Sequence, residues 1–200
     1  MKLDDLATVK TGLVTARKQA KNPSDMIAKY RQLNLKAINS RGYIDEEFLE
    51  EFLANERLRA EYLTQPGDIV VRLTTPYTAV LINEALSGLV IPSHFVIIRS
   101  NGKKIIPEYL YWLLNTEKVK SELQQNISST VIGTIKPTSY ANFDIEVLTI
   151  EEQKKIAELN LLAKKELCLL DQLMGQKEVY YKELISKVQK EMRRKKYEDN

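Results

Sequence analysis

The feature that most constrains this chain is its last quarter. Residues 151–196 form a stretch of 46 residues with no proline and a single glycine, Gly175. At 1.5 Å per residue an unbroken helix of this length is a rod of roughly 70 Å, far longer than an ordinary globular helix. Apolar residues recur along it at helical spacing, and such a stripe is not stable in water unless another surface covers it. The sequence therefore predicts a compact domain followed by a long helix that needs a partner. The recurring residues are Ile156, Leu159, Ala163, Leu167, Leu170, Met174, Tyr181, Ile185, Val188 and Met192.

Two interleaved series in this stretch repeat every seven residues. They are Leu167, Met174, Tyr181 and Val188, and Ala163, Leu170, Lys177 and Leu184. Heptads of this kind favour pairing with another helix over a helix folded back on its own domain. Lys177 interrupts the seam, and Gly175 is a candidate kink. The residues expected to face the partner helix are Leu159, Ala163, Leu167, Leu170, Met174, Tyr181, Ile185 and Val188.

The composition suits one ordinary globular domain plus an appendage, with 44% hydrophobic and 28% charged residues in 200. We expect three parts, which are a domain of residues 1–149, a long helix of residues 150–196 and a tail of residues 197–200. No run of 18 apolar residues occurs, so neither a transmembrane helix nor a membrane partner is expected. The polar N-terminus does not resemble a signal peptide. The single cysteine, Cys168, excludes an internal disulfide framework and fits a reducing, cytoplasmic location.

Charge is distributed unevenly along the chain. Residues 1–41 hold six Lys and three Arg against three Asp, a net of +6, and residues 44–68 hold eight acids against two Arg, a net of −6. Residues 190–196 carry a net of +4. This asymmetry permits a basic surface for nucleic acid beside an acidic one, but charge runs are usually solvated faces, so charge alone is weak evidence.

The first 149 residues mix strand and helix patterns. The Pro66-Gly67-Asp68 turn is expected to begin a strand, Asp45 to begin a helix that carries Phe48, Phe52 and Leu53, and Thr149 with Glu152 to form a capping box for the long helix. The fold class is therefore predicted as α+β, a mixed α/β domain followed by one long C-terminal helix. Strands are predicted at residues 33–38, 69–73, 79–82, 95–99 and 143–148, and a helix with Trp112 in the core at residues 107–125.

Four short segments carry a resemblance to a known family. They are Pro66-Gly67-Asp68-Ile69-Val70-Val71-Arg72, Ile106-Pro107-Glu108-Tyr109-Leu110-Tyr111-Trp112-Leu113-Leu114-Asn115, Ile132-Gly133-Thr134-Ile135 and Ile150-Glu151-Glu152-Gln153-Lys154-Lys155-Ile156-Ala157. In this order and spacing they resemble a DNA specificity (S) subunit of a type I restriction–modification system, over about residues 1–190. The last segment is the most specific of the four.

In that family a full-length subunit has two target-recognition domains and two long helices, which pair antiparallel. This chain resembles a half-size form, with one target-recognition domain and one helix, so the resemblance implies an intermolecular antiparallel coiled coil in a homodimer. Two identical domains on a two-fold axis would read a bipartite inverted repeat in double-stranded DNA, with the helices as a ruler of at most about 20 bp. The resemblance adds methyltransferase (modification) and restriction subunits as partners. Those partners would hold S-adenosylmethionine, ATP and Mg²⁺, with no cofactor in this chain.

The candidate DNA contacts are polar and basic residues in predicted loops, since arginine reads guanine and hydroxyl groups reach phosphates or bases. For Arg72 the alternative is an ordinary salt bridge, and for Tyr77 it is packing. For Ser128, Ser129, Thr130 and Lys136 the alternative is a solvated loop. Lys18, Lys21, Arg31 and Arg41 are expected to hold phosphate rather than to specify sequence. For His94 a core or edge position is favoured over a DNA contact. The candidates are Lys18, Lys21, Arg31, Arg41, Arg72, Thr74, Thr75, Tyr77, His94, Ser128, Ser129, Thr130 and Lys136.

No catalytic or metal site is predicted. His94 is the only histidine and Cys168 lies far from it in sequence, which argues against a zinc site. Thr75-Pro76-Tyr77 lacks the Asn/Asp and the second Pro of amino-methyltransferase motifs, and no Walker loop occurs. A stand-alone methyltransferase or nuclease is thus disfavoured. The main alternative to a DNA-reading module is a regulatory adaptor that pairs with a full-length S subunit or the methyltransferase without reading DNA.

Overall fold

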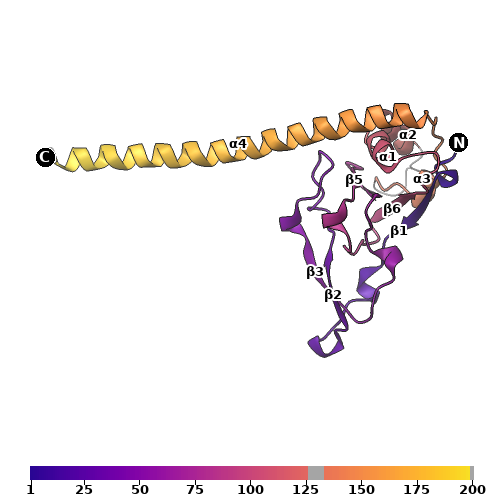
Figure 1. The fold of residues 1–200 in the computed structure, drawn as a ribbon. Helices are drawn as coiled ribbons and strands as arrows, with labels where there is room; N and C mark the ends of the chain where they lie inside the picture. The colour runs from indigo at the N-terminus through magenta and orange to yellow at the C-terminus, as the bar shows by residue number, and fades with distance from the viewer. Residues whose placement is uncertain (126–132, 199–200) are drawn as a thin grey trace. The chain divides into compact units, whose positions relative to one another are not determined.

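The computed structural model describes residues 1–125 and 133–198, with side chains through residue 193. The chain divides into two compact units, Met1–Glu158 and Leu159–Asn200. The first unit is an α+β domain of antiparallel sheets and helices, and the second continues one long helix, α4 (Ile150–Glu198), which begins in the first unit (Figure 1). The predicted α+β class is confirmed.

The main sheet has four antiparallel strands in the order β1-β6-β4-β5. Continuous apolar runs at residues 69–71 and 95–98 form the two central strands, because strands that are buried on both faces need apolar side chains at successive positions. The strands predicted at residues 69–73, 79–82 and 95–99 are confirmed. Their bounds are β1 (Ala7–Thr11), β4 (Asp68–Arg72), β5 (Ala79–Leu81) and β6 (Phe95–Ser100).

The central strands separate two layers of core. Ile69, Val71 and Ile98 face one cluster, while Val70 and Ile97 face the other, as the two-residue period of a strand requires. The helices supply the first cluster with Tyr109, Leu110, Val119, Leu123 and Tyr140. These helices are α1 (Pro107–Leu114), α2 (Glu117–Gln125) and α3 (Pro137–Ala141).

A half-buried ion pair fixes the turn before β4. Asp68 is fully buried, and Arg99 on β6 donates from Nε and Nη2 to its two carboxylate oxygens at 2.6 and 2.8 Å. The hydrogen bond with Asp68 is also the main reason why the pKa of Arg99 is raised. Gly67 has φ +84°, which glycine adopts without strain. The predicted tight turn is therefore present, and the ion pair holds β4 in register with β6.

A separate two-stranded sheet, β2-β3, forms where the sequence predicts a strand at residues 33–38 and a helix after Asp45. The strand predicted at residues 33–38 is wrong, because the strand lies in the preceding residues, as β2 (Ala28–Gln32). It ends there because Asn34 Oδ1 accepts hydrogen bonds from the backbone N–H groups of Lys36 and Ala37, which closes a turn.

The helix predicted from Asp45 is likewise wrong. Asp45 makes no capping hydrogen bond through its side chain, and only one turn of 3₁₀-helix follows it. Residues that were assigned to a helix form β3 (Glu50–Ala54), which pairs with β2 and buries Phe52 on one face. Tertiary pairing has overridden the local pattern. Single 3₁₀ turns cover Leu3–Asp5, Thr15–Arg17, Pro23–Asp25, Glu46–Phe48, Ala60–Tyr62 and Glu84–Leu86.

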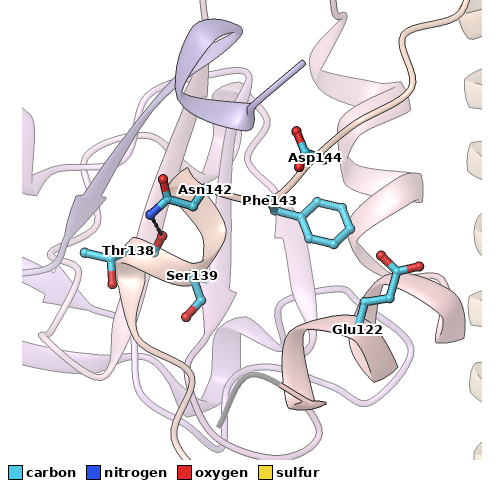
Figure 2. A pocket seen from close by; sticks show the side chains of 6 residues that line it. All are labelled: Glu122, Thr138, Ser139, Asn142, Phe143 and Asp144. Atoms are coloured by element: carbon cyan, nitrogen blue, oxygen red, sulfur yellow. Dashed lines mark hydrogen bonds between the residues drawn. The ribbon is translucent and has the colours of Figure 1, made fainter.

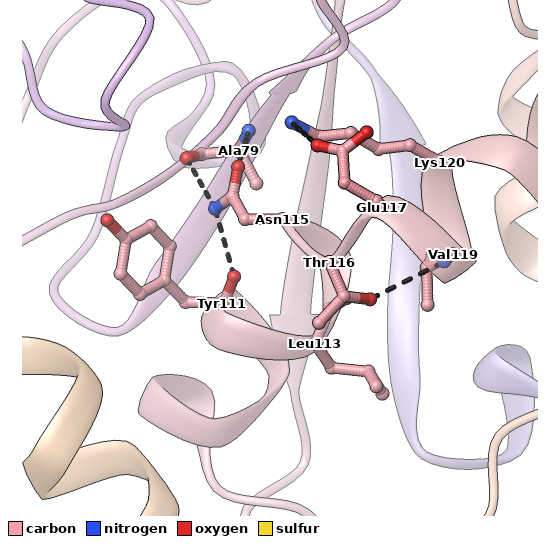
Figure 3. Close-up of polar contacts among 8 residues, drawn as sticks. All are labelled: Ala79, Tyr111, Leu113, Asn115, Thr116, Glu117, Val119 and Lys120. Atoms are coloured by element: carbon pink, nitrogen blue, oxygen red, sulfur yellow. Dashed lines mark hydrogen bonds and ion pairs between the residues drawn. The ribbon is translucent and has the colours of Figure 1, made fainter.

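The helix predicted over residues 107–125 is interrupted at Asn115 (Figure 3). The Asn115 amide donates to the carbonyl groups of Ala79 and Tyr111 and accepts from the Ala79 N–H, so it binds the edge strand β5. Thr116 then begins α2, since its Oγ1 accepts from the Val119 N–H. Trp112 was expected in the core. It is half-buried and packs against the first core cluster.

The strand predicted at residues 143–148 is wrong. Only an isolated bridge joins Asp144 to Lys2, and backbone hydrogen bonds join Phe143 and Ile145 to the first residues of the chain. Ile145 is buried in the first cluster, so the apolar alternation that suggested a strand is produced by packing.

The start of α4 is fixed by two devices. The predicted capping box is confirmed, because Thr149 and Glu152 exchange hydrogen bonds between side chain and backbone. The Gln153 side chain is fully buried, accepts from the Ile106 N–H at 2.9 Å and donates to the carbonyl groups of Lys104 and Leu148 at 2.8 Å. The most specific motif of the sequence therefore holds the first turn of α4 against the loop before α1.

Replacing Gln153 by leucine should lower the free energy of unfolding by about 2–5 kcal/mol, because three backbone groups lose the partner that a fully buried side chain gives them. Urea denaturation followed by circular dichroism measures the loss. The matched control is Gln172→Leu, an exposed position of the same helix, which should change stability by less than about 0.5 kcal/mol. Equal effects of the two substitutions would contradict the anchoring role of Gln153.

Candidate nucleic-acid interface

The end of β4 forms one side of the candidate interface. Arg72 is the last residue of β4, and its Nε donates to Thr74 Oγ1 at 3.1 Å. The loop that follows reverses the direction of the chain within a few residues. The Arg72 N–H donates to the Thr78 carbonyl, and the Tyr77 N–H donates to the Thr74 carbonyl. Thr75 is exposed in this loop. The contact with Thr74 orients the guanidinium and leaves its Nη donors for another acceptor.

Residues 133–136 lie against this loop. Thr74 bridges to Thr134, and the Ile135 N–H donates to the Leu73 carbonyl at 2.9 Å. The Tyr77 hydroxyl donates to the Gly133 carbonyl at 2.6 Å. Gly133 has φ +50°, and a Cβ atom there would stand 3.4 Å from that hydroxyl, so the approach suits glycine. Two candidate segments that are about 60 residues apart in sequence therefore share one end of the sheet.

His94 completes this end of the sheet. Its carbonyl accepts from the Leu73 N–H, and its ring centroid lies 4.5 Å from that of Phe95, with the two ring planes tilted by 49°. Its Nε2 is buried without a hydrogen-bond partner among the described atoms. Burial lowers the pKa of His94, and the positive charge of Arg72 lowers it further. The neutral form of the imidazole is therefore favoured.

We call these residues the reading patch and define it as Arg72, Thr74, Thr75, His94, Thr134 and Lys136. An arginine fork, three hydroxyl groups, an imidazole and a lysine are the groups that bind base edges and phosphates. Tyr77 was predicted among the contacts, but its ring is only 4% exposed and its hydroxyl is used within the chain. It lies beneath the reading patch. Thr134 is not among the predicted contacts, although it belongs to the third sequence motif and bridges to Thr74.

The basic residues near the N-terminus lie elsewhere, on the two-stranded sheet and its flanking turns. Lys18 pairs with Glu56 and Arg31 with Glu46, both at 2.8 Å. Lys29 on β2 also pairs with Glu51 on β3. The basic and acidic segments of the sequence are thus partly neutralised by each other. Because exposed ion pairs contribute only about 0–1 kcal/mol, such lysines and arginines can exchange a carboxylate for a phosphate.

Two other candidates differ in exposure. Lys21 is exposed, and Arg41 is half-buried with its backbone N–H bonded to Asn39 Oδ1. Ser128, Ser129 and Thr130 fall outside the described residues.

Other chemistries find little support in the described part of the chain. The described side chains, those of residues 1–125 and 133–193, include no group of three or more that could hold a metal ion. Across the same residues no helix has the length and apolar character to cross a membrane. A hollow of about 470 Å³ is lined by Glu122, Thr138, Ser139, Asn142, Phe143 and Asp144 (Figure 2). Its two carboxylates do not suit a phosphate.

The second unit displays the predicted apolar stripe. Leu159, Met174 and Ile185 are 70%, 61% and 68% exposed. All eight residues predicted to face a partner helix are exposed, as are further apolar side chains such as Leu162 and Leu173. The hydroxyphenyl ring of Tyr181 lies 5.9 Å from Lys177 Nζ, which places the one charged residue of the seam over an aromatic face.

Comparison with solved structures finds the fold of this chain in type I restriction–modification proteins. The HsdS subunit from Thermoanaerobacter tengcongensis matches with a TM-score of 0.64 at 17% sequence identity, over 88% of this chain and 44% of that chain. A chain from a structure on complex assembly and conformational transition of the type I R-M system matches with a TM-score of 0.65 at 19% identity, over 85% of this chain and 43% of that chain. A third match is the S subunit of a type I system from M. genitalium, with a TM-score of 0.49 and 13% identity, over 80% of this chain and 37% of that chain.

The first two matches confirm the predicted resemblance at the level of fold. This chain spans less than half the length of the solved chains that it matches. No protein-family model and no curated protein matches it.

His94 should titrate below its ordinary pKa of 6.5, because burial and Arg72 both disfavour the charged ring. The unfolded chain then binds a proton before the folded one, so this contribution to stability is present above pH 6.5 and is lost as the pH falls. As the only histidine, it gives one unambiguous pair of carbon-bound ring protons for a proton NMR titration. Arg72→Ala should move the midpoint upward only part of the way, because burial is the larger cause. A midpoint at or above 6.5 in the unchanged protein would contradict this description.

Proposed function

We propose that this chain is a DNA specificity module of a type I restriction–modification system. It binds DNA sequence-specifically, pairs with a second copy of itself and recruits methyltransferase and restriction subunits. The observation that carries the proposal is the fold match to HsdS structures over 88% and 85% of this chain. The four sequence motifs support it, because residues of all four make contacts that build the fold, among them Asp68, Asn115, Ile135 and Gln153.

DNA reading is assigned to the reading patch. Arg72 is held by Thr74 in an orientation that leaves two donor nitrogens, which match the O6 and N7 acceptors of guanine in the major groove. Thr75 and Lys136 are exposed and suit phosphate contacts. Tyr77 has a positioning role, since it joins the two loops that carry the patch. The N-terminal basic residues hold the DNA backbone without specifying sequence.

Dimerisation is assigned to the apolar stripe of α4. The large apolar side chains along one face of α4 are 40–70% exposed, and such exposure to water is unfavourable. The same stripe of a second copy covers them in a dimer with closed two-fold symmetry. An antiparallel pair places one domain at each end. Two-fold symmetry then requires an inverted repeat, whose half-sites are separated by at most about 20 bp, the length of a 49-residue helix.

Catalysis is assigned to partner subunits. The methyltransferase would hold S-adenosylmethionine, and the restriction subunit would hold ATP and Mg²⁺. This chain would supply the DNA site and the scaffold on which both dock, without a cofactor of its own.

Solution mass and recruitment together test the proposal. Light scattering should give about 46 kDa for the chain alone, twice its 23.0 kDa, and a larger complex when the cognate methyltransferase is added. That complex should methylate duplex DNA at one defined sequence. A 23 kDa species that gains no mass with the methyltransferase would overturn the proposal.

One observation favours a second candidate, the adaptor that does not read DNA. Lys18 and Arg31 are already paired with carboxylates, which lowers the positive charge available for phosphates. An adaptor would bind the methyltransferase or a full-length S subunit and show no sequence preference on DNA. Gel-shift competition between specific and random duplexes separates the two candidates.

Arg72→Ala should weaken binding to the specific site by about 1–3 kcal/mol if Arg72 reads a base, with little change on random DNA. Fluorescence anisotropy at one fixed salt concentration measures both affinities. The matched control is Arg59→Ala, an arginine with 82% side-chain exposure outside the patch. Equal losses on specific and random DNA would make Arg72 a phosphate contact, and no loss would remove it from the interface.

Replacing Leu167 and Leu170 together by glutamate should convert the dimer to a monomer, because charge enters the middle of the apolar seam. The control pair is Leu161→Glu with Val179→Glu, two exposed positions on the opposite side of the heptad. Sedimentation velocity should show a loss of mass only for the first pair. An unchanged mass for Leu167→Glu with Leu170→Glu would count against the coiled coil.

A further inference from the structure

The seam of α4 contains polar residues at three positions. The series that contains Leu167, which we call the first series, begins seven residues earlier, at Asn160. The series that contains Leu170, the second series, includes Lys177 and ends at Glu191, seven residues beyond its last apolar member. Lys177 and Glu191 are exposed, and Asn160 is half-buried. A polar residue in a helix seam is unfavourable opposite an apolar one, so these three positions restrict how a second helix lies along the seam.

The place of the two-fold axis decides which residues meet in an antiparallel pair of identical helices. Each residue of the first series packs against a residue of the second series of the other copy. The exposed stripe begins at Leu159 and ends at Met192, which are 70% and 67% exposed. An axis between Gly175 and Gln176, halfway along the stripe, places each end of one stripe beside the opposite end of the other. This pairing, the central register, covers the stripe over its whole length and involves residues of the second unit alone.

The central register opposes residues of like polarity at most levels of the seam. Asn160 meets Glu191 of the second copy at each end, so two polar side chains share one level. Lys177 is the one polar residue that faces an apolar side chain, that of Met174. The wholly apolar levels join Leu167 with Leu184, Leu170 with Tyr181 and Ala163 with Val188.

Charged residues flank the seam on both sides in this register. On one side Glu166 meets Lys187 of the second copy, and both are exposed. Opposite charges at such flanking positions favour the pairing. On the other side Asp171 meets Glu178, a like-charge contact that lowers the affinity of the pair and is screened by salt. The two flanks therefore offset each other, and the seam itself decides the register.

Lys177 has neighbours that suit a position near the axis. Its Nζ lies 5.9 Å from the centroid of the Tyr181 ring on the next turn, so the ammonium group has an aromatic partner within its own helix. Met174, which it faces in the second copy, is unbranched and adapts its shape to the apolar stem of a lysine. The central register therefore places the lysine opposite the most adaptable side chain of the first series.

A shift by one heptad is less favourable in either direction. In the register shifted toward the N-terminus, Lys177 faces Leu167 of the second copy. Asn160 then faces Leu184, so two leucines lose their apolar partners. In the register shifted toward the C-terminus, Glu191 faces Leu167, which places a carboxylate opposite a leucine. The polar residues of the seam therefore favour the central register.

We infer that two copies of α4 pair in the central register, with the two-fold axis between Gly175 and Gln176, and that Lys177 is a positioning residue that excludes the register shifted toward the N-terminus. The inference rests on the antiparallel pairing of the proposed function and adds the register to it. A single polar residue in a helix seam fixes the register at some cost in stability. One register is what two half-sites at one fixed distance require.

Distances between spin labels test the register. Two variants each carry one nitroxide label, at Lys165→Cys or at Ser186→Cys, and Cys168→Ser removes the natural thiol from both. Lys165 and Ser186 are exposed and lie equally far from the inferred axis, on its two sides. Pulsed electron paramagnetic resonance should therefore give the same separation in both dimers, about 32 Å along the helices, which is the rise of 21 residues. In the register shifted toward the N-terminus, the Lys165→Cys separation falls and the Ser186→Cys separation grows, each by about 10 Å.

Lys177→Leu tests the positioning role. Without the charge the dimer should form at least tenfold more tightly, and a second separation, displaced by about 10 Å, should appear at both labelled sites. The matched control is Lys182→Leu, at an exposed lysine of the same helix outside both series, which should leave the separations and the dimer constant unchanged. Sedimentation equilibrium measures the constant, and circular dichroism checks that each variant stays helical.

The possible failures are distinguishable. A monomeric unchanged chain overturns the proposed pairing and this inference together. Unequal separations at the two sites leave antiparallel pairing intact and overturn the central register, whereas short separations at both sites indicate a parallel pair and overturn both. A single, unchanged separation in the Lys177→Leu variants overturns the positioning role of Lys177.

Discussion

Covering the apolar stripe of α4 is the requirement on which the functional account depends. Side chains such as Leu159 and Ile185 are about 70% exposed, and burial of apolar surface contributes roughly 25 cal/mol per Å². At the start of α4 the first unit already buries one face of the helix, through Gln153 and Ala157. That anchor fixes the rotation of the helix about its axis. From Leu159 onward the apolar side chains of the stripe are exposed.

The candidate DNA site has a different physical basis. It is built from loops at one end of a sheet whose central strands are fully buried, so rigid elements hold short, polar segments in place. The Asp68–Arg99 pair fixes the start of β4, and the Tyr77–Gly133 hydrogen bond joins the loops at its end. The favoured neutral form of His94 and the orientation of Arg72 result from this packing. Specific recognition of bases needs such preorganised donors and acceptors.

The sequence predicted those parts of the fold that local chemistry determines. The turn at Gly67, the apolar strands β4 and β6, and the capping box at Thr149 each depend on residues within a few positions. The strand at residues 33–38 and the helix after Asp45 were wrong because Asn34 closes a turn and β3 pairs with β2. For the site, sequence singled out the segments around Arg72 and Gly133, but their contact across about 60 residues is a property of the tertiary structure. Glu46 and Glu56, which neutralise Arg31 and Lys18, could not be assigned as partners from sequence for the same reason.

Selection from a random pool of duplex DNA by the purified chain, followed by sequencing, tests the central claim most directly. If two copies read DNA through an antiparallel helix pair, the selected sequences will contain two identical half-sites in inverted orientation with one fixed spacing of at most about 20 bp. A single asymmetric half-site, inverted half-sites at variable spacing, or no enrichment would contradict the account.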